Sequence, residues 1–288
     1  MKELSEEQHY PVQHLCEYLH LSRGAYYRWL KKPVSYSEKR NQEIAETVKV
    51  IHEEHPDMGY RRIRDELNRH YDIDVNDKRI LRICRKEHIQ STIKWKPKSC
   101  TRNSDDPAHI AKNYLNRDFH ADAPNEKWLT DVTEFKYYIG PEVRKVYLSA
   151  ILDLYDRRIV AFEIGDHNDN PLVMNTFDAA VALEPNAHPL FHSDRGFQYT
   201  SKQFFTRLKK HHMKQSMSRV AHCIDNGPME GFWGILKREK YYGRRFTSRK
   251  DMVYAIENYI SYYNNERIQR NLHLMTPIEY HEQYYLAA

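Results

Sequence analysis

Apolar residues in the first third of the chain recur at the spacing of α-helices. Within residues 38–55 they share one helical face at Ile44, Val48 and Ile51. The same spacing predicts helices over 11–18, 23–30, 60–70 and 77–87. Ser22 and Asn76 precede two of these helices as typical N-caps, because short polar side chains accept a hydrogen bond from the first turn. We therefore predict two all-α helix-turn-helix units, over residues 1–35 and 36–90.

Large aromatic side chains gather on the helix expected over 23–30, at Tyr26, Tyr27 and Trp29. Aromatic residues fill the cores of small helical bundles, and they also stack on ligands. The sequence leaves both interpretations open for these three residues.

From residue 124 onwards the pattern changes to that of β-strands. Residues 127–138, 143–154 and 159–164 are rich in β-branched and aromatic side chains and are separated by short turns, which predicts an antiparallel meander. A helix over 170–183, a strand over 189–192, a helix from Thr200 with Gln203 completing a capping box, a strand over 214–218 and a helix from Pro228 should follow. This order predicts an α/β layer fold with a mixed sheet.

A polar, basic stretch without periodicity separates the two patterns, so we expect a basic linker over residues 91–120. The α/β domain is expected over 121–245, and a helical segment over 246–288 should complete the chain. The helix expected over 248–266 has an aromatic-rich apolar side formed by Met252, Ile256, Tyr259, Ile260 and Tyr263. That side should pack either into the core or against a second copy of the chain.

The distribution of charge along the chain indicates a candidate binding partner. The 288-residue chain has a formal charge of only +5, but its basic residues are concentrated between Lys78 and Arg102. A basic second helix after a short turn is the outline of a DNA-reading unit, although a solvated basic helix would have the same composition. The candidate DNA contacts in this stretch and on the helix before it are Arg61, Arg62, Lys78, Arg79, Arg82, Lys94, Lys96 and Lys98.

Other classes of protein are disfavoured. No run of about 18 apolar residues is present, and the acidic N-terminus is unlike a signal peptide. The four cysteines lack a C-x-x-C pair, which favours a reduced, cytoplasmic setting. A zinc site that uses His52, His55, Cys84 and Cys100 is an unattractive alternative, because the spacing of these residues is poor.

Three carboxylates stand at distinctive positions of the expected α/β order. Asp131 lies within the first strand, Asp194 follows the fourth strand, and Glu230 begins the last helix. Acidic residues from three elements can meet at one edge of such a sheet and hold two divalent cations roughly 3.5–4 Å apart, an arrangement that serves phosphoryl displacement. Hard oxygen ligands favour Mg²⁺ or Mn²⁺.

The helix that carries Glu230 should present Gly234 and Lys237 on the same face, with Phe232, Ile235 and Leu236 roughly opposite. The glycine would leave a gap where a large partner, such as a DNA backbone, could approach. Nearby, Asp153 and Asp156 are interpreted as structural acids. His192 either orients a carboxylate or DNA, or is simply packed at a strand end.

Several motifs together resemble the DDE transposases of bacterial insertion sequences, in particular the second-reading-frame (OrfB) products of the IS three family. The motifs are Trp128-Leu129-Thr130-Asp131-Val132-Thr133-Glu134, His192-Ser193-Asp194-Arg195-Gly196, Asp225-Asn226-Gly227-Pro228-Met229-Glu230, and Tyr263-Asn264-Asn265-Glu266-Arg267. In the first half, Gly59-Tyr60-Arg61-Arg62-Ile63 is similar as well, so the resemblance covers almost the whole chain.

This resemblance implies a ribonuclease-H-like core similar to retroviral integrases, with Asp131, Asp194 and Glu230 as the triad and two Mg²⁺ or Mn²⁺ ions. It implies that Lys237 contacts transposon-end DNA. The partners would be terminal inverted repeats, target DNA and further copies of the chain on nucleoid DNA. No leucine zipper is evident, so fusion to the first-reading-frame product is also implied. The alternatives are a non-catalytic DNA-binding regulator and a nuclease without strand transfer.

Overall fold

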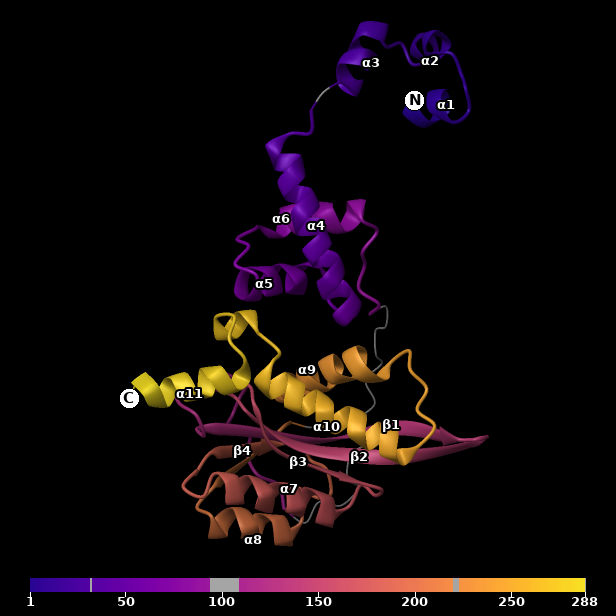
Figure 1. Cartoon of the computed structure of the whole chain (residues 1–288). Helices are drawn as coiled ribbons and strands as arrows, with labels where there is room; N and C mark the ends of the chain where they lie inside the picture. The colour runs from indigo at the N-terminus through magenta and orange to yellow at the C-terminus, as the bar shows by residue number, and fades with distance from the viewer. Residues whose placement is uncertain (32, 94–108, 220–222, 288) are drawn as a thin grey trace. The chain divides into compact units, whose positions relative to one another are not determined.

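The computed structural model describes residues 1–31, 33–93, 109–219 and 223–287, and the chain divides into compact units at Met1–Ser91 and Thr92–Ala288 (Figure 1). The predicted linker residues Lys94, Lys96 and Lys98, together with Cys100, lie outside the described residues. None of the described helices combines the length and apolar character needed to span a bilayer.

The first unit is helical, as predicted. Its elements are α1 (Lys2–Glu6), α2 (Val12–Tyr18), α3 (Arg23–Leu30), α4 (Tyr36–Glu54), α5 (Tyr60–His70) and α6 (Asp77–Lys86). The side chains of Ser22 and Asn76 accept hydrogen bonds from the N–H groups of Ala25 and Arg79, which confirms both caps. Ser35 caps α4, so this helix begins two residues before the predicted start.

Two different hydrophobic arrangements occur in this unit. Helices α4, α5 and α6 share a buried cluster that includes Ile44, Val48, Ile51, Ile63, Leu67 and Ile80. On α3, Tyr26 is buried and stacks on Trp29, whereas Tyr27 and Trp29 remain 49% and 60% exposed. The core interpretation therefore holds for Tyr26 and does not hold for the other two aromatic residues.

The second unit is built on a five-stranded mixed sheet in the order β3-β2-β1-β4-β5. Its strands are β1 (Lys127–Ile139), β2 (Glu142–Asp153), β3 (Ile159–Gly165), β4 (Leu190–Ser193) and β5 (Lys214–Met217). The first three pair antiparallel as the predicted meander, and β1, β4 and β5 run parallel. Helix α7 (Asn170–Leu183) supplies the long connection that a parallel return to β4 requires.

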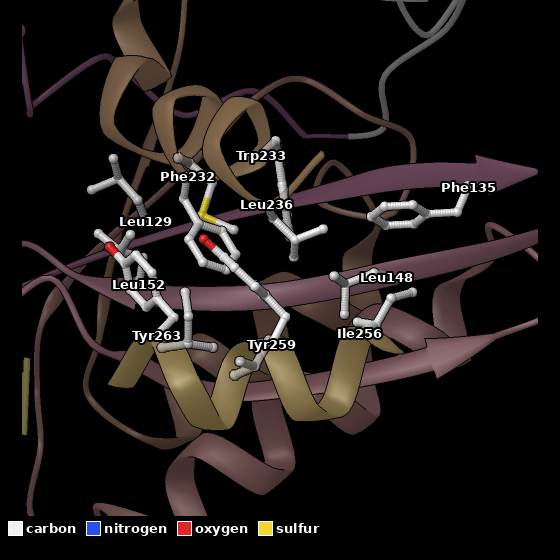
Figure 2. Packing of buried hydrophobic residues seen from close by; sticks show 14 of the residues in the cluster. Leu129, Phe135, Leu148, Leu152, Phe232, Trp233, Leu236, Ile256, Tyr259 and Tyr263 are labelled. Atoms are coloured by element: carbon white, nitrogen blue, oxygen red, sulfur yellow. The ribbon is translucent and has the colours of Figure 1, made fainter. Parts of the chain in front are cut away.

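Alternation along the strands gives the sheet two apolar faces. Trp128 and Ile151 belong to a cluster with α7 and α8 (Lys202–Lys210), whereas their neighbours Leu129 and Leu152 belong to a cluster with α9 (Gly227–Leu236) and α10 (Arg249–Asn265). Figure 1 shows one helical layer on either side of the sheet, and Figure 2 shows the α9–α10 cluster at close range. The apolar side of α10 is core, which decides between the two interpretations of that helix.

One helix start differs from its prediction. Thr200 does not begin α8, because Ser201 is the residue whose side chain accepts the N–H of Phe204. Helix α11 (Pro277–Ala287) lies within the predicted C-terminal helical segment, as a separate helix after α10. Tyr280 and Tyr284 contact the ring of Tyr155, at centroid distances of 5.1 and 5.4 Å.

A buried ion pair fixes the chain after α9. The helix continues as a π-helical turn over Lys237–Tyr241, and Glu239 in this turn accepts hydrogen bonds from the hydroxyl of Tyr259 and the guanidinium of Arg267. The side chains of Glu239 and Arg267 are only 6% and 12% exposed. The pair therefore joins the end of α9 to α10 and to the residues that follow it.

We expect Glu239→Gln to lower the free energy of unfolding by about 3 kcal/mol, because it leaves the charge of Arg267 buried without its counter-ion. Urea denaturation followed by circular dichroism measures this change. Glu142→Gln is the matched control, since its pair with Arg144 is 61% and 56% exposed and should contribute about 0.5 kcal/mol or less. Equal effects of the two substitutions would contradict the structural role of Glu239.

Candidate active site

The parallel pairing of β1 with β4 brings the two candidate aspartates together. Trp128 pairs with Phe191, and Leu129 pairs with His192. Asp131 lies two residues after Leu129, and Asp194 follows the end of β4 two residues after His192. The two carboxylates are close enough for the charge of Asp194 to raise the pKa of Asp131. Asp131 lies on the side of the sheet that α9 covers, because the indole N–H of Trp233 donates to it.

Asp131 is held on both of its oxygens. Its Oδ1 accepts the N–H of Val132 at 2.8 Å, and its Oδ2 accepts the indole N–H of Trp233 at 3.0 Å. Burial raises the pKa of Asp131 most, the charge of Asp194 raises it further, and the two hydrogen bonds oppose this rise. The site thus places a carboxylate where its negative charge is poorly compensated.

Asp194 is oriented by the turn that follows β4. Its Oδ1 accepts the N–H of Gly196 at 2.8 Å, and burial raises its pKa. A Cβ atom at residue 196 would lie 3.0 Å from Asp194 Oδ1 and 3.0 Å from Gln198 Oε1, so only glycine leaves the carboxylate undisturbed. Burial raises the pKa of Tyr199, and the negative charges of Asp131 and Asp194 raise it further.

Glu230 lies in the first turn of α9 and is more exposed than the two aspartates. Partial burial raises its pKa, and its charge contributes the smallest of the effects on the pKa of Asp131. Among the described residues, no three His, Cys, Asp or Glu side chains are close enough to hold a metal ion together. The structure therefore brings Asp131 and Asp194 together and leaves Glu230 outside their immediate contact.

The guanidinium of Arg238 lies beside Gly234 on α9. A Cβ atom on Gly234 would lie 3.7 Å from it, an ordinary contact with the end of a flexible side chain. Lys237 places its Nζ 5.1 Å from the ring centroid of Phe135. Burial lowers the pKa of Lys237, and the negative charges of Asp131 and Glu134 oppose this shift.

The other singled-out residues of this unit are structural. Asp153 accepts hydrogen bonds from the N–H groups of Asn125 and Tyr155, and Asp156 binds the side chains of Arg158 and His281. The buried His192 lies between the hydroxyls of Ser216 and Ser218, and its burial lowers its pKa to about 4. These contacts confirm the structural interpretation of the two acids and the packed interpretation of His192.

Two residues before α9 escaped the sequence analysis. Asn226 was quoted only as part of a motif, and its side-chain amide donates to the backbone oxygen of Thr130, next to Asp131. Asp225 was quoted only as part of a motif, yet its side chain is completely buried and accepts hydrogen bonds from Arg117 and Arg219. The one sign of this role in the sequence was an aspartate at a position expected to lie in a loop.

The candidate DNA contacts on α5 and α6 form two groups. Arg61, Lys78 and Arg82 are exposed. Arg62 pairs with Asp57 at 3.1 Å, and Arg79 donates from Nε to Oδ1 of Asn41 at 2.8 Å, so these two also stabilise the helices.

Known proteins and families agree with this architecture. Integrase core domain models match residues 121–223 and 230–285, and an HTH-like domain model matches residues 39–97. The chain is 37% identical to the putative transposase InsK for insertion sequence element IS150 of Escherichia coli (strain K12), over 99% of both chains. It is 26% identical to the transposase InsF for insertion sequence IS3fB of the same organism, over 90% of this chain and 91% of that one. Among solved structures, an HTLV-2 integrase catalytic core domain is similar at a TM-score of 0.43 and 20% identity, over 56% of this chain and 99% of that one.

A ribonuclease-H-like mixed sheet that pairs two aspartates at its parallel strands, preceded by an HTH-like domain, defines a DDE polynucleotidyl transferase with an integrase core. The chain belongs to the IS three family of insertion-sequence transposases. An integrase-like core implies dependence on divalent metal ions in general.

Gly196→Ala should reduce DNA strand cleavage by at least about tenfold, because the added Cβ displaces the carboxylate of Asp194 by a few tenths of an ångström. The free energy of unfolding should change by less than about 1 kcal/mol, since a side-chain end can move aside cheaply. Gly231→Ala is the control, as no atom lies within 4 Å of its added Cβ. Cleavage rates and melting temperatures of both variants test this, and full activity of Gly196→Ala would contradict it.

Proposed function

We propose that this chain cleaves DNA at the ends of its insertion sequence and joins those ends to target DNA, with Asp131, Asp194 and Glu230 as the catalytic carboxylates. The paired aspartates carry this proposal. Asp131 is kept beside Asp194 although burial and the charge of its neighbour both raise its pKa. Two neighbouring carboxylates do not stabilise a fold. A protein that keeps such a pair together typically uses it in a functional site.

The donor set suits hard divalent cations. Asp131 presents a carboxylate from β1, Asp194 from the turn directly after the neighbouring β4, and Glu230 from the first turn of α9. We expect these three residues to hold two Mg²⁺ or Mn²⁺ ions. Such ions activate the attacking oxygen and stabilise the leaving oxygen of a phosphodiester.

The protein groups around the carboxylates have separate tasks. The indole of Trp233 fixes one oxygen of Asp131, and the N–H of Gly196 fixes one oxygen of Asp194, so both carboxylates keep one orientation. Lys237 lies beside Asp131 with a charge that suits a DNA phosphate. Its contact with transposon-end DNA is part of the proposal.

Recognition of the insertion-sequence ends is assigned to the helix-turn-helix units. Helix α6 carries Lys78 and Arg82 exposed beside one another on a helix that has a short turn before it, which suits insertion into a DNA groove. Arg61, Arg62, Arg79, Lys94, Lys96 and Lys98 complete the proposed basic surface. Its ligands would be the terminal inverted repeats.

Two ends must be held during transposition, so the working complex should contain several copies of the chain on DNA. We further propose that fusion to the product of the first reading frame is the full transposase, and that it acts on nucleoid DNA. A chain without the fusion would then bind and cleave its ends less efficiently than the fused protein.

We expect Asp131→Asn, Asp194→Asn and Glu230→Gln each to lower the rates of cleavage and joining by at least about a thousandfold, because each removes a charged metal ligand. The assay incubates the full chain with Mg²⁺ and a labelled duplex that ends in the terminal repeat. Binding of that duplex should persist in all three variants, since no contact of the helix-turn-helix units is changed.

Asp178→Asn is the matched control, because this aspartate pairs with Arg207 on the surface and should leave both rates unchanged. Joined products support the transposase, and indiscriminate cleavage would instead indicate a nuclease without strand transfer. Retarded but uncut DNA with the unaltered chain would indicate a regulator. Full activity of Asp194→Asn would contradict the proposal that Asp131, Asp194 and Glu230 form a catalytic triad.

A further inference from the structure

Asp225 is the centre of a buried charge cluster near the three catalytic carboxylates. Its side chain is 0% exposed and accepts five hydrogen bonds. The donors are Asn113 Nδ2 at 3.0 Å, Arg117 Nε at 2.7 Å, and the backbone N, Nε and Nη2 of Arg219 at 3.0, 2.9 and 2.9 Å. The hydrogen bonds from Arg219 contribute most to holding the pKa of Asp225 well below its usual range, so the group is ionised.

The cluster lies at the same sheet edge as the carboxylates. Ser218, which precedes Arg219, donates its N–H to the backbone oxygen of Ser193, the residue before Asp194. Asn226, which follows Asp225, donates to the backbone oxygen of Thr130, the residue before Asp131. One hydrogen bond therefore joins a residue beside the cluster to β1, which carries Asp131, and one joins a residue beside it to β4, which Asp194 follows.

Two guanidiniums share this one carboxylate, so the cluster has a formal surplus of one positive charge. Asp225 binds an inner edge of each guanidinium, while the side chains of Arg117 and Arg219 remain 41% and 44% exposed. Arg117 also adopts a left-handed backbone conformation with φ of 65°, which costs a non-glycine residue free energy. The chain thus maintains a strained residue to present a pre-oriented guanidinium to solvent.

We propose that Arg117 and Arg219, oriented by Asp225, form a binding site for a backbone phosphate of the DNA strand that enters the active site. This deepens the proposed function and rests on it. A guanidinium suits phosphate because its planar donors match two phosphate oxygens. A neutral or cationic ligand would not benefit from the surplus positive charge, and a base edge would not require two arginines on one carboxylate.

The test measures DNA affinity of the full chain in EDTA, with a random-sequence duplex and a terminal-repeat duplex, over a range of salt concentrations. Arg117→Gln should weaken both complexes by the same factor, roughly fivefold, and reduce the salt slope by about 1. The double variant Arg219→Gln with Asp225→Asn removes a guanidinium together with its buried counter-ion, and should act in the same way.

Arg144→Gln is the matched control, because this arginine is 56% exposed, pairs with Glu142 and lies away from the cluster. If the variants fold and keep the affinity and salt slope of the unaltered chain, the proposal is wrong and the cluster has only a structural role. If the double variant fails to fold, Arg117→Gln alone tests the proposal. In that single variant Asp225 still accepts four of its five hydrogen bonds, so the fold should persist. Binding in EDTA needs no catalysis, so failure of the catalytic triad leaves this result readable.

Discussion

The parallel pairing of β1 with β4 is the contact on which the candidate active site depends. It brings Asp131 close to Asp194 although the two residues belong to distant parts of the sequence, and Asp131 accepts a hydrogen bond from Trp233 of α9. Neighbouring carboxylates in a buried setting oppose folding, so their proximity has to be supported by other contacts. The two apolar clusters on either face of the sheet provide that support, because separating the strands would expose both.

Much of this fold could be predicted from local pattern. The strands, α7 and the caps at Ser22 and Asn76 follow from periodicity and from residue types that act within a few positions. Asp131 and Asp194 could be found because the expected strand order allows them to meet at one edge of the sheet and because their motifs resemble a known family. The role of Asp225 could not, since its partner Arg117 lies 108 residues away and no local pattern identifies a buried ion cluster. The position of the Arg238 guanidinium beside Gly234 could not be predicted for a related reason, because periodicity places Arg238 on the same face without showing where its long side chain folds.

Helix α9 is anchored more firmly than its three glycines and short length would indicate. Trp233 binds Asp131, the preceding Asn226 binds Thr130, and the following π-helical turn is fixed by Glu239 through its buried pair with Arg267. Figure 2 shows Phe232, Trp233 and Leu236 directed into the cluster that α9 shares with the sheet and α10. Glu230 is exposed in the first turn of the helix, three residues before Trp233.

This anchoring determines how Glu230 can join the two aspartates. A shift of the whole helix would break three polar contacts and uncover apolar side chains, whereas rotation of an exposed glutamate sacrifices only side-chain freedom, about 1–2 kcal/mol. A third negative charge beside Asp131 also opposes the approach, since Glu230 already raises the pKa of that residue from its outer position. The geometry therefore combines an aspartate pair fixed by the sheet and its neighbouring contacts with an exposed glutamate in the first turn of α9.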